Sequence, residues 1–243
     1  MMAPARTGLR ALAFALPVAV GLAGAAAASC RLGLVLALDV SGSVDAGEYR
    51  LQIDGLAGAL ADPSVGAALF AMPGANVDLT VFEWSGPNSA RVVLDWTTID
   101  SPATLATAID QLRGTPRQEM EPATAIGSAM LRGAGQLQSR AACWRRAIDI
   151  SGDGESNMGP RPQSLPDAGA LAGITINGLV IGQASADQAG SAGNLQGYYT
   201  AYVIRGPDAF VEVASGFDNY QEAMRRKLVR ELQVLAVAGG DSQ

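Results

Sequence analysis

The stretch LGLVLALDVSGSVDAGEYR, residues 32–50, carries the clearest fold signal in the chain. It begins with the continuous apolar run 32–38, which lacks the alternation of a half-exposed strand and therefore predicts a strand buried on both faces of a parallel sheet. The run ends on Asp39, and Ser41 and Ser43 follow at alternate positions. Three interpretations of this polar cluster are open: helix capping, a nucleophile, or part of a metal site.

Predicted strands and helices alternate along the rest of the chain. The strands are predicted at 76–86, 90–96, 145–151, 174–182 and 209–214, and the helices at 45–62, 101–114, 122–139, 164–173 and 219–237. The first two of these strands flank a short Gly-Pro-Asn turn, which is typical of an antiparallel hairpin. Such an alternation gives a mostly parallel sheet with helices on both faces. We therefore predict a three-layer, doubly wound α/β fold with a six-stranded, mostly parallel sheet and one antiparallel edge strand. Segment 185–204 is polar and Gly-rich, and we expect it to become helical or extended only near its end.

Residues 1–29 have the features of a secretory signal peptide. Arg6 and Arg10 precede an apolar stretch that ends in a run of small residues, as in the charged, apolar and cleavage regions of such peptides. The apolar part is short and interrupted by Gly and Pro, unlike a membrane span of about 20 residues. We predict one mature domain over 30–243, located in the periplasm or secreted, with no transmembrane segment.

Composition excludes several classes of function. The formal charge of -6 and the pI near 4.7 argue against binding to nucleic acids or anionic membranes. The chain has no histidine, which removes Ser-His-Asp and Cys-His catalysis and the usual zinc and copper ligands. A metal ion would therefore be held by oxygen, which favours Mg²⁺, Ca²⁺ or Mn²⁺.

The two cysteines, Cys30 and Cys143, predict a disulfide, since an even cysteine count is typical of exported proteins with disulfides. Each lies just before a predicted strand that leads to an aspartate. If the two strands are parallel neighbours, both cysteines lie at the same end of the sheet. The alternative, lipidation of Cys30, is less expected because no leucine stands three places before it.

Oxygen-bearing side chains are predicted to converge at the other end of the sheet. Asp39 and Asp153 follow two strands, with Ser41 and Ser43 in the first loop and Thr124 near the start of the helix 122–139. Ligands of open parallel sheets bind at the carboxyl ends of the strands. Carboxylates that converge without a nearby cation need an external cation or a proton, and Mg²⁺ suits a site of a few carboxylates and hydroxyls.

The pattern Asp39-x-Ser41-x-Ser43, with Thr124 and Asp153, resembles the metal-ion-dependent adhesion site (MIDAS) of von Willebrand factor A domains. The resemblance implies that the two serines and the threonine coordinate the ion, whereas the two aspartates act mostly through water or without direct contact. It also implies an open coordination position for an acidic side chain of a partner protein. The spacing of Asp45 and Glu48 predicts the capping box of the following helix, which leaves the preceding cluster free for the ion.

Six segments resemble more narrowly the DUF1194 family, a bacterial set of exported von Willebrand A-like proteins. They are CRLGLVLALDVSGSVDAGEYRLQ (30–52), VFEWSG (81–86), VLDWTTIDSP (93–102), IDISGDGESN (148–157), INGLVI (176–181) and GPDAFVEVASGFDNYQEAMRRKLVREL (206–232). The family implies a fold and a metal site but no activity.

Several other polar or aromatic residues have structural interpretations. Further loop oxygens come from Glu121, Ser151, Ser156, Glu155 and Asn157, of which Glu121, Glu155 and Asn157 could form the rim of a site. Trp84 and Trp96 are expected to pack on the sheet. A basic face of the last helix is predicted from Arg225, Arg226, Lys227 and Arg230, where positive charge near a helix end is favourable.

Enzyme interpretations are weaker. Phosphatases that use a strand-ending aspartate usually have a second aspartate where Ser41 stands here, and a serine nucleophile would lack a base. We therefore predict an exported, non-enzymatic protein-binding module that depends on Mg²⁺, Mn²⁺ or Ca²⁺. The alternatives are a metal-dependent phosphoryl hydrolase on the same site and a scaffold domain with a vestigial metal site.

Overall fold

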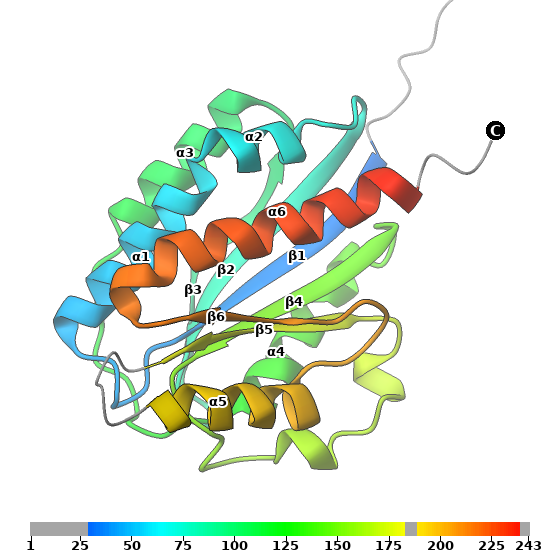
Figure 1. Ribbon diagram of the computed structural model, residues 1–243. Coiled ribbons are helices and arrows are strands. Elements are labelled where there is room, and N and C mark those ends of the chain that lie inside the picture. Colours follow the sequence, from blue (N-terminus) through cyan, green and yellow to red (C-terminus); the bar gives the residue numbers. More distant parts are fainter. Residues whose placement is uncertain (1–28, 183–188, 239–243) are drawn as a thin grey trace, which may run out of the picture.

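The computed structural model describes residues 29–182 and 189–238 and contains one six-stranded sheet (Figure 1). Its strands are β1 (Ser29–Asp39), β2 (Ala75–Trp84), β3 (Ala90–Ile99), β4 (Arg145–Gly152), β5 (Thr175–Ile181) and β6 (Val211–Ala214). They lie in the order β3-β2-β1-β4-β5-β6. Every neighbouring pair is parallel except β2 and β3, so the predicted sheet with one antiparallel edge strand is confirmed. Residues 1–28, the bulk of the predicted signal peptide, lie outside the described residues, and Ser29 is the first residue of β1.

Helices cover both faces of the sheet and give three layers (Figure 1). One face carries α1 (Ala46–Leu60), α2 (Pro63–Leu69), α3 (Pro102–Arg113) and α6 (Tyr220–Ala238), and the other carries α4 (Ile126–Leu137) and α5 (Ala189–Tyr198). No helix within the described ranges combines the length and the apolar character needed to cross a bilayer.

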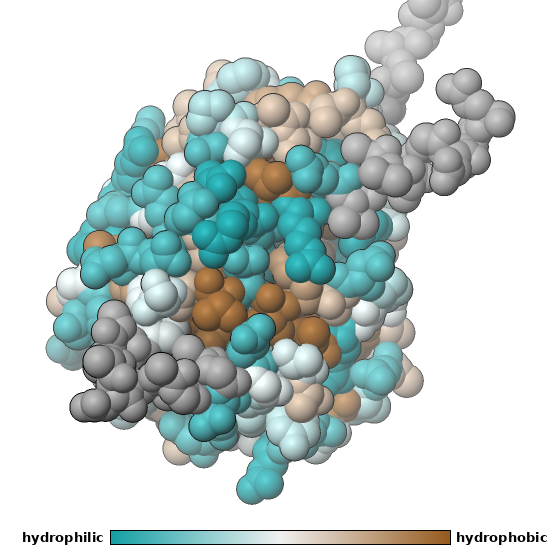
Figure 2. Space-filling view, in the orientation of Figure 1, coloured by the Kyte–Doolittle hydropathy of each residue, from teal (hydrophilic) through white to brown (hydrophobic). Residues whose placement is uncertain are grey.

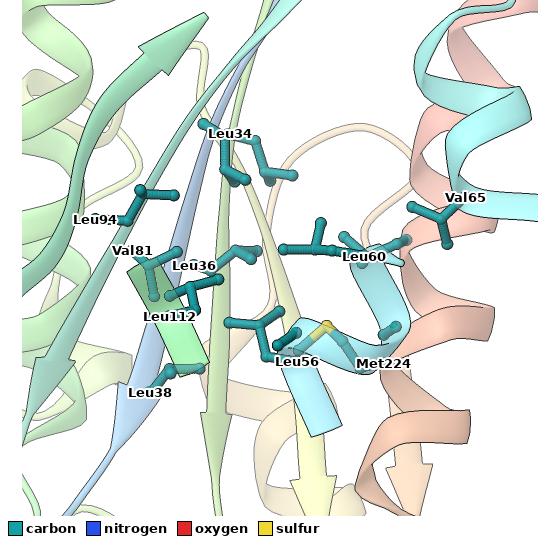
Figure 3. Close-up of a cluster of buried hydrophobic side chains, with 14 of the residues drawn as sticks. Leu34, Leu36, Leu38, Leu56, Leu60, Val65, Val81, Leu94, Leu112 and Met224 are labelled. Carbon is teal, nitrogen blue, oxygen red and sulfur yellow. The ribbon is translucent and has the colours of Figure 1, made fainter. Parts of the chain in front are cut away.

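The central strand β1 contributes to both hydrophobic cores. Leu34, Leu36 and Leu38 point toward α1 and α6 (Figure 3), whereas Val35 and Ala37 pack on the α4 and α5 side. Because successive side chains of a strand point to opposite faces, a strand between two helix layers is apolar at every position. This explains the continuous run from which the strand was predicted.

Several helix predictions differ from the structure. The helix predicted at 122–139 begins only at Ile126, and the segment expected to become helical or extended only near its end already forms α5 from Ala189. The helix predicted at 45–62 ends at Leu60, and a separate α2 begins after Asp62, whose side chain accepts a hydrogen bond from Ser64 N. The helix predicted at 164–173 is wrong. That segment contains two short 3₁₀ turns at Pro162–Ser164 and Gly169–Leu171, because Pro166 and the positive φ of Gly169 interrupt a regular helix.

Capping at the start of α1 follows the prediction. Asp45 accepts a hydrogen bond from Glu48 N, and the Glu48 side chain accepts one from Asp45 N. Ser101 forms a similar reciprocal cap with Thr104 ahead of α3. These caps fix where both helices begin.

The disulfide predicted between Cys30 and Cys143 is present. It joins the beginning of β1 to the residue pair before β4, with the two Cα atoms 4.6 Å apart and a sequence separation of 113. Since it closes so long a loop, it removes much of the entropy of the unfolded chain.

Removal of this disulfide by the double substitution Cys30→Ser and Cys143→Ser should lower the free energy of unfolding by about 2–5 kcal/mol. Urea unfolding of the oxidised wild type and of the double variant measures this difference. Reduced wild type is the control, and it should match the variant. Equal stabilities of the oxidised wild type and the variant would contradict the prediction.

The predicted basic face of α6 is wrong at Lys227, which is fully buried. Its ammonium group pairs with Asp149 and lies 3.8 Å from a carboxylate oxygen of Glu231. Asn177 Nδ2 donates to Asp149 Oδ1 at 3.3 Å and to Glu231 Oε1 at 3.1 Å. Burial and the charge of Asp149 raise the pKa of Glu231 to about 8, against the opposing effect of Lys227. A polar cluster of β4, β5 and α6 thus lies inside the domain.

The other basic residues of α6 lie at its surface, which is mostly hydrophilic (Figure 2). Arg225 pairs with Glu222, and Arg226 pairs with Glu212 of β6. The guanidinium of Arg230 lies 3.9 Å from the centre of the Phe210 ring. These partners leave little of the helix face free to bind an anion.

Glu231→Gln should reduce the dependence of stability on pH. The folded protein keeps a proton on Glu231 that the unfolded chain, with a pKa of about 4.3, releases. Stability is therefore greatest below that pH and is lost as the pH rises toward 8. Urea unfolding at pH 5 and at pH 8.5 measures how far the free energy of unfolding falls between these pH values. This decrease should be smaller in the variant than in the wild type, by on the order of 1–2 kcal/mol.

The matched control is Glu222→Gln on the exposed side of the same helix. Arg225 lowers the pKa of Glu222, so this substitution should leave the change between pH 5 and pH 8.5 as it is in the wild type. An unchanged pH dependence in Glu231→Gln would contradict a protonated Glu231.

Candidate metal centre

The first part of the candidate centre is the carboxyl end of β1. Asp39 is fully buried, and its Oδ1 accepts a hydrogen bond from Ser41 N at 2.8 Å. Gln52 of α1 donates its Nε2 proton to the Asp39 carbonyl at 2.9 Å, which ties the end of the strand to the helix. The Oδ2 atom of Asp39 is buried and has no hydrogen-bond partner among the described residues.

The second part is the loop after β4, which lies beside β1 in the sheet (Figure 1). Ser43 Oγ donates to Asp153 Oδ1 at 2.7 Å, and Ser41 Oγ lies 3.2 Å from Ser43 Oγ. Because β1 and β4 are parallel neighbours, their carboxyl ends meet at one edge of the sheet. Four of the five predicted ligands therefore form one connected network.

The third part is the loop that carries Thr124. Gly42 N donates to Pro122 O at 3.0 Å, and a Cβ on Gly42 would lie 2.9 Å from Pro122 Cβ, so the two loops approach closely because position 42 has no side chain. Thr124 N donates to Asn157 Oδ1, and Asn157 N donates to Thr124 O, both at 2.9 Å. The backbone thus holds Thr124 between the other two loops. Its hydroxyl forms no hydrogen bond with the residues that the structure describes.

Two acidic groups share this edge without a basic side chain to neutralise them. Burial, and next the charge of Asp153, raise the pKa of Asp39 to about 7, although hydrogen bonds from Ser41 oppose the change. Burial also raises the pKa of Asp153, against hydrogen bonds from Ser43 and from its own backbone. In the described part of the chain, no arginine or lysine forms an ion pair with either carboxylate. A bound cation would stabilise both ionised groups.

The donor set suits a hard divalent ion. Two carboxylates and three hydroxyls are ligands that Mg²⁺, Mn²⁺ and Ca²⁺ accept, and the free Oδ2 of Asp39 is a buried oxygen in need of a partner. Among the described residues, one other group could resemble a metal site: the ligand atoms of Cys30, Asp78 and Cys143 lie within 4.8 Å of one another. Its sulfurs form the disulfide, and Asp78 pairs with Arg140 at 2.7 Å.

The remaining predicted rim residues have separate roles. Asn157 supports the Thr124 loop as described, and Ser156 Oγ donates to Thr124 O at 3.4 Å. Ser151 faces the opposite side of the sheet, where its Oγ lies 3.3 Å from Tyr220 Oη. No hydrogen bond from the Glu121 or Glu155 side chain joins the network within the described ranges.

The two tryptophans pack as predicted. Trp84 is buried in the core on the α4 side of the sheet. Trp96 packs against that core, and the guanidinium of Arg140 lies 4.5 Å from the centre of its ring. Neither residue takes part in the candidate centre.

Two residues of the centre were missed in the sequence. Gln52 is a buried polar residue on an otherwise apolar helix face. This break in the apolar pattern could have indicated its role from the sequence. Tyr199 lies in the Gly-rich segment without clear periodicity, yet it is fully buried beside the two carboxylates. Burial and the charges of Asp39 and Asp153 raise the pKa of Tyr199 further above its ordinary value, so its hydroxyl keeps its proton.

The fold is similar to that of several solved proteins. Proximal thread matrix protein 1 from the mussel byssus is 14% identical, with a TM-score of 0.56 over 85% of this chain and 49% of that chain. A von Willebrand factor type A protein from Catenulispora acidiphila is 16% identical, with a TM-score of 0.53 over 84% and 43%. The pilus adhesin SpaC from Lactobacillus rhamnosus GG is 14% identical, with a TM-score of 0.52 over 85% and 30%. The chain thus spans half or less of each of these proteins.

These similarities define the fold as that of a von Willebrand factor A domain, as the resemblance in the sequence implied. The chain belongs to the family described as "Protein of unknown function (DUF1194)", whose sequence model matches residues 29–236. No curated protein matches the chain.

Asp39→Asn should stabilise the domain in the absence of divalent ions. At pH 8 in EDTA, the substitution removes a buried charge whose neighbour is also negative, so the free energy of unfolding should rise by on the order of 2 kcal/mol. Urea unfolding measures this change. The control is Asp54→Asn, an exposed aspartate paired with Arg50, which should change stability by less than about 0.5 kcal/mol. A lower stability of Asp39→Asn would refute this account of the electrostatics.

Proposed function

We propose that this domain is an exported protein-binding module whose centre holds a divalent ion through Asp39, Ser41, Ser43, Thr124 and Asp153. Mg²⁺ is the preferred ion, with Mn²⁺ or Ca²⁺ as substitutes. The observation that supports this function best is the buried Asp39 carboxylate, which lies beside a second carboxylate and the two serine hydroxyls of its own loop and lacks a basic partner among the described residues.

Each residue has a distinct part in this proposal. Ser41, Ser43 and Thr124 supply neutral oxygens to the ion, and Asp39 and Asp153 supply the negative charge that retains it. A bound ion would offer a positive charge at the edge of the sheet for an anionic group of another molecule. Because the direct ligands would be neutral oxygens and the aspartates would act mostly through water, the ion would keep an open position that favours an anionic ligand. An acidic side chain of a partner protein is the matching ligand.

A cavity beside the centre could receive the partner. It has a volume of about 470 Å³ and is lined by Ser41 and Gly42 on one side and by Arg117, Glu119 and Met120 on the other. Arg117 donates a hydrogen bond to the Val44 carbonyl, which places a positive charge near the Ser41 loop. A partner segment with an acidic residue would gain from both this charge and the ion.

Proteins of similar fold support the proposed binding function. One is described as a pilus adhesin and another as a thread matrix protein. A structure of the thread matrix protein has a zinc-occupied MIDAS motif, at 15% identity and a TM-score of 0.52 over 84% of this chain and 48% of that chain. Export is supported by the disulfide, since disulfides persist in oxidising compartments, and by the signal-peptide features of residues 1–29.

Thermal unfolding with and without divalent ions tests the centre. Millimolar Mg²⁺ or Mn²⁺ should raise the Tm of the wild type, because an ion that binds only the folded state stabilises it. Asp39→Ala and the double variant Ser41→Ala/Ser43→Ala should lose this increase. Asp95→Ala, at an exposed position of β3, should keep it. No increase in the wild type would favour a scaffold with a vestigial site.

Capture from an envelope fraction tests the function itself. Immobilised domain should retain a partner in Mg²⁺ and release it in EDTA, and Asp39→Ala should retain none. The same preparations are assayed with a phosphate monoester. Turnover that disappears in Asp39→Asn would replace the binding function with a metal-dependent phosphoryl hydrolase.

A further inference from the structure

Tyr199 lies beside the candidate metal centre, on the face of the sheet that α4 and α5 cover. It is the first residue of a π-helical turn, Tyr199–Val203, that directly follows α5. Its side chain is fully buried and packs in the core on the α4 side. Such turns are rare, and they occur often at functional sites.

Two glycines of neighbouring strands leave room for the Tyr199 side chain. A Cβ on Gly178 of β5 would lie 2.7 Å from Tyr199 Cδ1, and a Cβ on Gly152 of β4 would lie 2.5 Å from Tyr199 Oη. Both distances are shorter than any real Cβ contact. The ring therefore crosses β5 and β4 at the two positions where the strands carry no side chain.

The hydroxyl of Tyr199 ends beside the free oxygen of Asp39. The same Cβ position on Gly152 lies 3.0 Å from Asp39 Oδ2, so the two oxygens adjoin one small volume. Neither atom has a hydrogen-bond partner among the described residues. Buried polar atoms are almost always hydrogen-bonded. The Tyr199 hydroxyl can donate and Asp39 Oδ2 can accept, so each atom is the suitable partner of the other.

The other fully buried tyrosines have partners. Tyr49 Oη donates to Glu83 at 2.6 Å, and Tyr220 Oη lies 3.3 Å from Ser151 Oγ. Of the three buried tyrosines in the described ranges, Tyr199 is therefore the one whose hydroxyl is unsatisfied. A phenylalanine at position 199 would pack in the core equally well, so packing does not explain the hydroxyl group.

We infer that Tyr199 is a positioning residue of the metal centre, whose hydroxyl donates a hydrogen bond to Asp39 Oδ2 directly or through one water. With Ser41 N already bonded to Oδ1, each oxygen of the carboxylate then has one donor, and the carboxylate is held in one orientation toward the ion. This role rests on the proposed function. It also connects the ion to the π-helical turn after α5, on an element that contains none of the five proposed ligands.

Tyr199→Phe tests this role through two measurements, of metal affinity and of stability without metal. The affinity for Mn²⁺ and Mg²⁺, measured by calorimetric titration, should fall by about 10- to 100-fold, as is usual when a group that orients a metal ligand is removed. The Tm of the same variant in EDTA should fall by no more than that of Tyr220→Phe, because each substitution removes one buried hydrogen bond.

Tyr220→Phe is the matched control. It removes the hydroxyl of an equally buried tyrosine that is bonded to Ser151 on the opposite face of the sheet. Its Tm in EDTA should fall, and its affinity for Mn²⁺ should equal that of the wild type. A purely structural tyrosine at 199 would behave in this way too.

The outcomes separate the two proposals. Wild-type affinity in Tyr199→Phe, or a lower Tm in EDTA with no change in affinity, would overturn the role of Tyr199 and leave the proposed function intact. A wild type that binds neither Mn²⁺ nor Mg²⁺ would overturn both.

Discussion

The buried carboxylate of Asp39 is the constraint on which the rest of the centre depends. It ends the central strand, whose other side chains fill two hydrophobic cores, so it cannot turn into solvent without withdrawing β1. The parallel register that pairs Leu38 with Ser151 then brings the Asp153 loop beside it. A second negative charge is thereby added to a site that burial already makes unfavourable for the first.

The domain contains two buried acidic clusters that are stabilised differently. Beneath α6, the carboxylate of Asp149 pairs with Lys227 beside the protonated Glu231, so the chain supplies its own cation. At the carboxyl end of β1, the described residues supply hydroxyl groups and backbone donors but no basic side chain that pairs with Asp39 or Asp153. The contrast favours an external cation at the second cluster, since an uncompensated buried charge is costly.

Stability and the proposed function therefore make opposite demands at the two ends of β1. The disulfide at its beginning constrains the unfolded chain across 113 positions. Asp39 at its end destabilises the domain until a cation or a proton compensates the charge. Proteins commonly tolerate such locally unfavourable groups at functional sites, and the two cores on either side of β1 hold the carboxylate in place.

The sequence by itself determined the sheet, its hairpin edge, the capping of α1 and the cysteine pair, because these depend on local periodicity, capping patterns and strand direction. The alternation of strands and helices was also enough to bring Asp39, Ser43 and Asp153 to one edge. Only the tertiary structure decided the rest. Lys227 looked like part of a basic surface because its partners, Asp149 and Glu231, meet it only after α6 packs on the sheet. Tyr199 had no signal in its Gly-rich segment, since its position depends on two glycines in other strands. Long-range packing determines which polar groups become buried together, and local sequence patterns do not predict this packing.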